Sequence, residues 1–322
     1  MPKTYYLAAD GGGSKLQAIL YDESFRTIRT GRVAGVNTLF KPADTVRDNM
    51  ESMMAELLRD ESGVPIRALA SADLCMLGSG DVMREILSRM DFVGEIRFHS
   101  EPEVGLAACL RTDGAVALSG TGSDAFFVKN GKSLQSVGGW GPLLGDEGSG
   151  YDIGLNALKA AIYSYDGRRD KSMLYDLVME NWSLENLWGI VYHLAGNPDA
   201  RHEVASAAKL CAKAAHAGDR TALRIYEHAA LEMFLQARTV IDRYRCEWDG
   251  TVVVMGGAWK GHPRMFEVFK REIELLYPEA RVSLPLFEPV VGCAVLRALH
   301  EGMTLTELKA PLTEGFADFR YP

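Results

Sequence analysis

The chain has 322 residues, a length that predicts two domains of ordinary size. Hydrophobic residues make up 47% and charged residues 24% of the chain, as in globular proteins, and the formal net charge is -8. Nucleic acids and anionic membranes select basic surfaces, so this charge argues against both as general partners and favours small-molecule ligands.

The first predicted element is a β-hairpin over residues 5–22. The apolar run YYLAAD ends at Asp10, the turn GGGSK follows, and QAILYD returns to an apolar pattern. Glycines leave backbone N–H groups open to close approach by a phosphate, and Ser14 adds a hydroxyl donor. A tight hairpin without a ligand is the alternative for this turn on its own.

The segment RFHSEPEVGLAACL, residues 97–110, predicts the end of a strand followed by a helix. Ser100 and Glu103 have the spacing of a capping box, and Pro102 suits the first turn of a helix. We therefore expect Glu103 to cap this helix.

A second hairpin is predicted where AVALSG meets TGSDAFFVKN, over residues 115–130. Both turns have glycine at their first and third places and a hydroxyl at their fourth, which here is Ser123. Neither turn has the spacing of a Walker loop or a dinucleotide fingerprint. The repeat predicts two similar domains, each contributing one phosphate-binding hairpin to a cleft between them.

Residues 201–245 predict two amphipathic helices separated at HAGD, with Asp219 as the N-cap of the second. Their Ala, Leu and Met positions suit core packing or a homodimer contact. The histidines His99, His193 and His262 are isolated and have no metal-binding spacing.

A third glycine turn, Gly256–Gly257, follows the apolar strand TVVVM and precedes a helix. That helix has an apolar stripe, expected to be buried, at Met265, Phe266, Phe269, Ile273 and Leu276. Glycine here permits close approach of a flat ligand such as adenine. An ordinary strand-to-helix connection is the alternative.

Five segments together resemble the N-acetylglucosamine kinase family, within the BadF/BadG/BcrA/BcrD ATPase group of the actin, sugar kinase and Hsp70 superfamily. They are DGGGSK, GTGSD, GGWGPLLGDEGSGYDIG, VVVMGGAWK and EPVVGCAVLRAL, in the family's order and spacing over residues 4–300. The resemblance implies an α/β protein of two ribonuclease-H-like domains, the actin-like ATPase fold, around a nucleotide cleft. The expected domains are residues 1–112 with the returning segment 290–322, and residues 113–289.

The resemblance also implies ATP and Mg²⁺ as cofactors and phosphorylation of an amino sugar at its 6-hydroxyl. The sugars considered are N-acetylglucosamine, glucosamine and N-acetylmuramic acid. Asp10 resembles the acid that holds the nucleotide's magnesium through water, since Mg²⁺ keeps several waters and few carboxylates. The residues that resemble ATP contacts are Gly12, Gly13, Ser14, Lys15, Thr121, Gly122, Ala205, Gly256, Gly257, Ala258, Trp259 and Lys260.

The residues that resemble the sugar-binding set are Asn37, Glu101, Ser123, Asp124, Gly139, Trp140, Gly141 and Asp146. Asn and Asp supply directional hydrogen bonds to ring hydroxyls, and an indole packs on apolar sugar or acyl surface. The alternatives are that Asn37 closes a turn and that Trp140 belongs to the core.

Glu101 stands where the family has an aspartate that takes the proton from the attacking sugar hydroxyl. It is followed by Pro102, and the family has alanine there. A carboxylate is retained, so we interpret Glu101 as the catalytic base, although a misplacement of about 1 Å can cost about a hundredfold in rate.

Two alternative functions remain open. An activator that delivers electrons to a CoA-ester dehydratase or reductase would bridge a dimer with a cysteine-bound iron–sulfur cluster. A sugar-binding kinase homologue without turnover is the other, suggested by Glu101 and Pro102.

The five cysteines are scattered without a CxxC pair, so we expect free buried thiols. No window approaches the run of about 18 apolar residues of a membrane span, so we expect a cytoplasmic protein.

Overall fold

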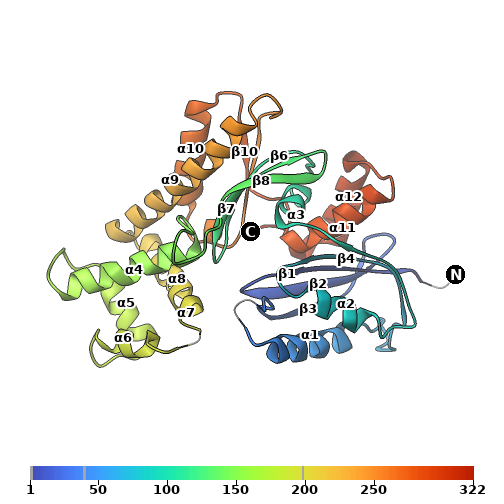
Figure 1. Ribbon diagram of the computed structural model, residues 1–322, viewed down its shortest axis with the longest axis horizontal. Helices are drawn as coiled ribbons and strands as arrows, with labels where there is room; N and C mark the ends of the chain where they lie inside the picture. The colour runs from blue at the N-terminus through green and yellow to red at the C-terminus, as the bar shows by residue number, and fades with distance from the viewer. Residues whose placement is uncertain (1–2, 39–40, 198) are drawn as a thin grey trace. The chain divides into compact units, whose positions relative to one another are not determined.

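The computed structural model describes residues 3–38, 41–197 and 199–322, which form two compact units (Figure 1). Unit 1 takes in the described residues of Met1–Thr112, Asn130–Ser133 and Leu284–Pro322. Unit 2 takes in those of Asp113–Lys129 and Leu134–Ser283. The domain limits expected from the sequence stay a prediction.

Unit 1 contains a five-stranded sheet of order β3-β2-β1-β4-β5. Its first three strands are antiparallel neighbours, whereas β4 lies parallel to β1, and β5 lies parallel to β4. In register, Asp10 on β1 lies beside Cys75 on β4, so both strands end at one edge of the sheet. The strands are β1 (Tyr5–Gly11), β2 (Lys15–Asp22), β3 (Thr27–Ala34), β4 (Ala68–Met76) and β5 (Phe92–Phe98).

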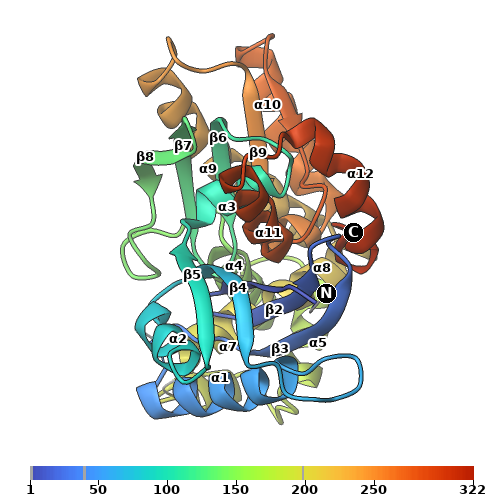
Figure 2. The ribbon, with the colours of Figure 1, turned by 90° about the vertical axis from the view of Figure 1, so that its right-hand side faces the viewer.

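Helices cover both faces of this sheet (Figure 2). Helices α1 (Ala43–Leu57) and α2 (Gly80–Leu87) pack on the face that carries Leu7 and Ala9. The opposite face, with Ala8, packs against α3 (Glu101–Ala107), α11 (Pro289–His300) and α12 (Leu305–Gly315). The final turn η2 is Ala317–Phe319. Burial on both faces explains why the first strand is apolar almost throughout.

Unit 2 contains a second five-stranded sheet, of order β10-β9-β6-β7-β8. Taken from β8, its pairing follows that of unit 1: β6 and β7 are antiparallel, β9 lies parallel to β6, and β10 lies parallel to β9. Both predicted hairpins are therefore confirmed, and each begins an equivalent sheet. The strands are β6 (Gly114–Ser119), β7 (Ser123–Lys129), β8 (Lys132–Gly138), β9 (Thr251–Met255) and β10 (Arg281–Ser283).

The helices of unit 2 form two apolar clusters. The larger joins α8, α9 and α10 to the small inward residues Ala115, Ala117 and Ala125 of the hairpin, and the smaller joins α4, α5 and α7. These elements are α4 (Gly150–Tyr165), α5 (Met173–Asn181), α6 (Gly189–Leu194), α7 (Ala200–Ser206), α8 (Ala208–His216), α9 (Arg220–Arg243), η1 (Ala258–Lys260) and α10 (Pro263–Leu276).

Two helix predictions need correction, and one is confirmed. Asp219 caps α9 by accepting the backbone N–H groups of Thr221 and Ala222, as predicted. The helix expected before it is two helices, α7 and α8, which meet at Ala207. The expected burial of Leu276 is wrong: it is 48% exposed because α10 ends there, and the next residue, Tyr277, turns inward instead.

Within the described ranges, no helix is both long enough and apolar enough to cross a bilayer.

Candidate active site

The hairpin of unit 1 leaves open space around the glycines at its tip. The Gly12 N–H donates to the Lys15 carbonyl at 3.0 Å, and the Gly12 carbonyl accepts from the Val36 N–H at 2.9 Å. A Cβ built on Gly12 or Gly13 would meet no described atom within 4 Å. Internal packing therefore does not require glycine at these two positions, whereas close approach of a ligand to the backbone would.

Asp10 lies beside this tip, at the end of β1, and is partly exposed. Burial raises its pKa to about 6, although Lys15 and a hydrogen bond from the Cys75 thiol act to lower it. The carboxylate of Glu288, the N-cap of α11, adds to the increase. Glu288 also lies 3.7 Å from the Lys15 ammonium. Glu288 and Cys75 were not predicted as site residues, because their proximity to Asp10 arises only from the fold.

Glu101 is the first residue of α3, and its charge adds to the increase in the pKa of the Cys75 thiol, after burial, Asp10 and Cys293. Cys75 is thus paired with Asp10 in the sheet and lies within electrostatic reach of Glu101. Asn37, which is buried, lies against the Gly78 backbone just beyond β4. The structure therefore brings these sequence-predicted residues of unit 1 to the ends of β1 and β4.

The predicted capping box at the start of α3 is confirmed. The Ser100 N–H donates to Glu103 Oε2 at 3.1 Å, and Glu103 Oε1 accepts the Ser133 N–H at 3.2 Å. Both oxygens of Glu103 are engaged with backbone, which separates its role from that of Glu101.

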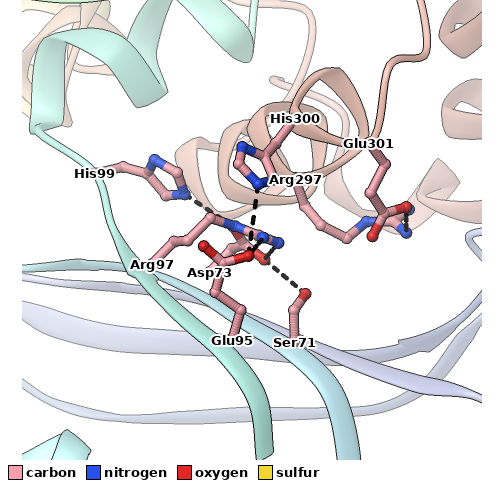
Figure 3. Close-up of polar contacts among 8 residues, drawn as sticks. All are labelled: Ser71, Asp73, Glu95, Arg97, His99, Arg297, His300 and Glu301. Atoms are coloured by element: carbon pink, nitrogen blue, oxygen red, sulfur yellow. Dashed lines mark hydrogen bonds and ion pairs between the residues drawn. The ribbon is translucent and has the colours of Figure 1, made fainter.

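A buried network of hydrogen bonds and ion pairs links β4 to the end of β5, just before Glu101 (Figure 3). Asp73 on β4 is fully buried and binds Arg97 through two hydrogen bonds, of 2.7 and 2.9 Å. Its carboxylate also lies 3.0 Å from His99 Nε2 and accepts the Ser71 hydroxyl at 2.9 Å. Burial acts to raise the pKa of Asp73, but the hydrogen bonds from His99 and Arg97 outweigh it and hold the pKa below its usual range. His99, which had no assigned role, is thereby fixed two residues before Glu101.

The hairpin of unit 2 rests on the start of α4. The carbonyls of Gly120 and Thr121 accept backbone N–H groups of Gly150 and Tyr151 at 2.8 and 3.3 Å. The third glycine turn lies against it, since a Cβ on Gly256 would come 2.2 Å from the Ser119 carbonyl oxygen. Two of the three predicted ATP-binding turns therefore meet within unit 2.

The side chains after that third turn differ in accessibility. Trp259 is buried, donates its indole N–H to the Ala117 carbonyl at 3.2 Å and packs on Phe269. The indole is therefore a core group, and only the backbone of Trp259 could reach a nucleotide. Ala258 is partly exposed beside it, Lys260 is exposed, and Ala205 lies partly exposed on α7.

Two of the predicted sugar-binding residues of unit 2, Asp124 and Asp146, are carboxylates that each pack against a glycine. Asp146, 3% exposed and with φ of 63°, lies against Gly122 and forms an ion pair with Arg201 at 3.1 Å. The Asp124 carboxylate lies against Gly139. Burial and the charge of Asp146 raise the pKa of Asp124 to about 6.

Two other predicted sugar-binding residues differ in whether their side chains are available to a ligand: the Ser123 hydroxyl is hydrogen-bonded, whereas Trp140 is exposed. The Ser123 hydroxyl donates to the Glu147 carbonyl at 2.6 Å and so supports the loop. Trp140 is 75% exposed, which excludes the alternative of a core tryptophan. It stands between Gly139 and Gly141, whose φ values of 71° and 81° favour glycine. Arg201 was not anticipated, because only the fold brings α7 to this loop.

A model of the BadF/BadG/BcrA/BcrD ATPase family matches residues 9–297. The chain belongs to this family. Membership in this ATPase family implies that the chain uses ATP. The family resemblance found in the sequence is thereby confirmed.

Curated relatives of this BadF/BadG/BcrA/BcrD ATPase family chain include two that match it almost end to end. An N-acetylmuramic acid/N-acetylglucosamine kinase of Clostridium acetobutylicum is 25% identical over 307 residues, 91% of this chain and 97% of the relative. An N-acetyl-D-glucosamine kinase of Dictyostelium discoideum is 24% identical over 317 residues, 92% and 98% of the two chains. A glucosamine kinase of Vibrio cholerae is 23% identical over 184 residues, 56% and 62%.

Solved structures share the fold. A candidate N-acetylglucosamine kinase from Porphyromonas gingivalis has a TM-score of 0.71 at 16% identity, covering 92% of this chain and 99% of that one. A ROK family glucokinase from Streptomyces griseus, in complex with glucose and AMPPNP, has a TM-score of 0.60 at 14% identity, covering 92% and 100%. The predicted α/β, actin-like fold class is confirmed.

Proposed function

We propose that this protein is an ATP-dependent kinase of an amino sugar, with N-acetylglucosamine, glucosamine or N-acetylmuramic acid as the acceptor. The family's use of ATP and the activities named for its relatives support this reaction class. The observation that carries the proposal is that Asp10 ends β1 in register with Cys75 of β4, beside a glycine tip with open space around it, while Glu101, at the start of α3, has a charge that reaches the same thiol. The reaction uses ATP, and we propose that it takes place in the cytoplasm.

The proposed nucleotide contacts are the backbone and hydroxyl groups of the two hairpin tips, with Ser14, Lys15 and Thr121 among them. Asp10 and Glu288 are the groups that would hold a magnesium ion. Their fit rests on the chemistry of the donors: a partly exposed carboxylate with a raised pKa is one that a cation would stabilise, and Mg²⁺ needs few carboxylates because it keeps its waters. When bound, the ion would neutralise phosphate charge.

Glu101 is the proposed general base. It accepts the proton of the sugar hydroxyl while that oxygen forms a bond to the γ-phosphorus, and the bond from that phosphorus to the ADP oxygen breaks. We propose the 6-hydroxyl as the attacking group. Asn37, Asp124 and Asp146 would fix the ring through hydrogen bonds, and Trp140 would cover its apolar surface.

The activator function has less support from the cysteines. Four of the five, Cys75, Cys109, Cys211 and Cys293, are buried and only Cys246 is exposed. A cluster shared between two subunits needs accessible thiolates, and burial raises the pKa of these four thiols.

A sugar panel tests the proposal. The purified protein, ATP and Mg²⁺ would be incubated with each amino sugar and with glucose, and ADP release would be followed by a coupled assay. Proton and phosphorus NMR of the product would identify the phosphorylated oxygen. ATP-dependent release with at least one amino sugar is expected, whereas binding of a sugar without any ADP release would favour the non-catalytic homologue.

A further inference from the structure

The buried carboxylate of Asp73 is fully supplied with hydrogen-bond donors. Its Oδ1 accepts from Arg97 Nε at 2.7 Å and lies 3.0 Å from His99 Nε2. Its Oδ2 accepts from Arg97 Nη2 and from the Ser71 hydroxyl, each at 2.9 Å. An ionised carboxylate can only accept and has about four lone-pair sites, so all of them are used. The contact with His99 therefore requires a proton on Nε2 of the imidazole.

Arg97 supplies the positive charge that the buried Asp73 needs. The two side chains form an ion pair at 2.7 Å, and the second carboxylate beside Arg97, that of Glu95, is exposed and lies 3.5 Å from His300 Nε2 (Figure 3). A neutral imidazole with its proton on Nε2 is thus sufficient to complete the set of donors to Asp73. What His99 contributes is a fixed attachment between the end of β5 and β4.

The backbone just before Glu101 is attached to the same strand. The His99 N–H donates to the Leu74 carbonyl at 2.8 Å, so the main chain and the side chain of His99 both bond β4. Ser100 follows, and its N–H donates to Glu103 Oε2 at 3.1 Å. Glu101 is the next residue and begins α3. Ser100 alone therefore separates the proposed base from a residue that is fixed in the sheet.

We propose that His99 is a positioning residue, and that its Nε2–H bond to Asp73 sets where the Glu101 carboxylate lies for proton transfer. Neighbouring Cα atoms are about 3.8 Å apart, so a shift of His99 passes to Glu101 across only two peptide bonds. A misplacement of about 1 Å can cost about a hundredfold in rate. Buried ion pairs often add little net stability, so stability alone is a weak explanation for this network. The inference rests on the proposed kinase function and adds a residue that orients its base.

His99→Phe tests the proposal, because it removes the N–H donor and keeps a ring. With the amino sugar that the wild type uses best in the sugar panel, we expect kcat to fall about ten- to a hundredfold while KM for the sugar changes little. Ser71→Ala is the matched control: it removes another donor from the same carboxylate, but on β4, which does not lead to Glu101. It should lower the melting temperature, as His99→Phe does, and leave kcat nearly unchanged.

Two amides at position 99 provide a rescue test that does not depend on the folding of His99→Phe. The amide N–H₂ of glutamine has a reach similar to that of imidazole Nε2 and can donate to Asp73. Asparagine is one methylene shorter and its amide falls short of that position. His99→Gln should therefore keep most of the wild-type kcat, and His99→Asn should lose it.

The proposal is overturned if His99→Phe has the wild-type kcat, or if His99→Phe and Ser71→Ala lower kcat equally for the same loss in melting temperature. Equal kcat values for His99→Gln and His99→Asn would also overturn it. In each of these cases the kinase function stands, because the wild type still releases ADP with its sugar. Absence of ADP release by the wild type with every amino sugar would instead refute the proposed function itself, and this inference with it.

Discussion

Replacing Glu101 by glutamine separates its chemistry from its place in the fold. Glutamine has the same length and shape, but it cannot take a hydroxyl proton. We therefore expect kcat to fall by roughly two to four orders of magnitude, the contribution of a positioned base. That loss corresponds to about 3 to 5 kcal/mol of transition-state stabilisation. Sugar affinity and the melting temperature should change little, because Glu101 is only the first residue of its helix.

Glu103→Gln is the matched control, since it makes the same chemical change two residues away. Glu103 accepts two backbone N–H groups, from Ser100 and Ser133. A glutamine oxygen can keep one of them, but its amide N–H₂ group would face the other donor. The loss of one charge-assisted bond predicts destabilisation on the order of 1 to 3 kcal/mol with kcat nearly unchanged.

The assay is steady-state ADP release with saturating ATP, combined with thermal unfolding of each variant. Glu101→Asp restores the aspartate of the family pattern, and we expect its activity within about tenfold of the wild type because Pro102 fixes the local backbone. An active Glu101→Gln beside a folded but inactive Glu103→Gln would show that the base is Glu103 and that the interpretation of this turn is wrong.

Three further predictions concern unit 2. Asp146→Asn should weaken sugar binding by at least tenfold and leave nucleotide affinity nearly intact, measured by calorimetry; an equal loss of both in a folded variant would contradict the assignment. The pKa of Asp124 is raised to about 6, so the folded protein binds a proton at this carboxylate more readily than the unfolded protein does. The resulting contribution to stability is fully present below about pH 4 and is lost as the pH rises through about 6. Asp124→Asn should therefore stabilise the fold by on the order of 1 kcal/mol at pH 7.5 and by much less at pH 4, and equal effects on unfolding at both pH values would exclude this cause. Gly256→Ala should destabilise by several kcal/mol, because its φ is 108° and the new Cβ would strike the Ser119 carbonyl, whereas Gly257→Ala has open space at φ of -75°; similar melting temperatures would refute the steric argument.

Local patterns in the sequence predicted local structure well. The capping box at Ser100 and Glu103, the N-cap at Asp219 and both hairpins depend on residues within a few positions of one another. For such features the interacting partners stand in one short stretch of sequence. The physical cause is also local, because the side chain bonds backbone groups that the element leaves without partners.

The missed features depend on distant parts of the chain. Arg201 reaches Asp146 across 55 positions, and Glu288 reaches Lys15 from the end of the chain that returns to unit 1. No periodicity or motif links such pairs. The direction of a side chain in a tight turn is equally hidden, and for this reason the sequence could not show that the Trp259 indole points into the core.

The two equivalent hairpins carry different charges. When the turns are superposed by their glycines, Asp10 of unit 1 corresponds to Ser119 of unit 2, and Lys15 corresponds to Asp124. Ser119 is fully buried and donates its hydroxyl to the Gly148 carbonyl at 2.7 Å, so an acid at that position would be a charge without water around it. The two hairpins therefore share a backbone pattern but present different groups, a carboxylate and an ammonium in unit 1 and a single carboxylate in unit 2.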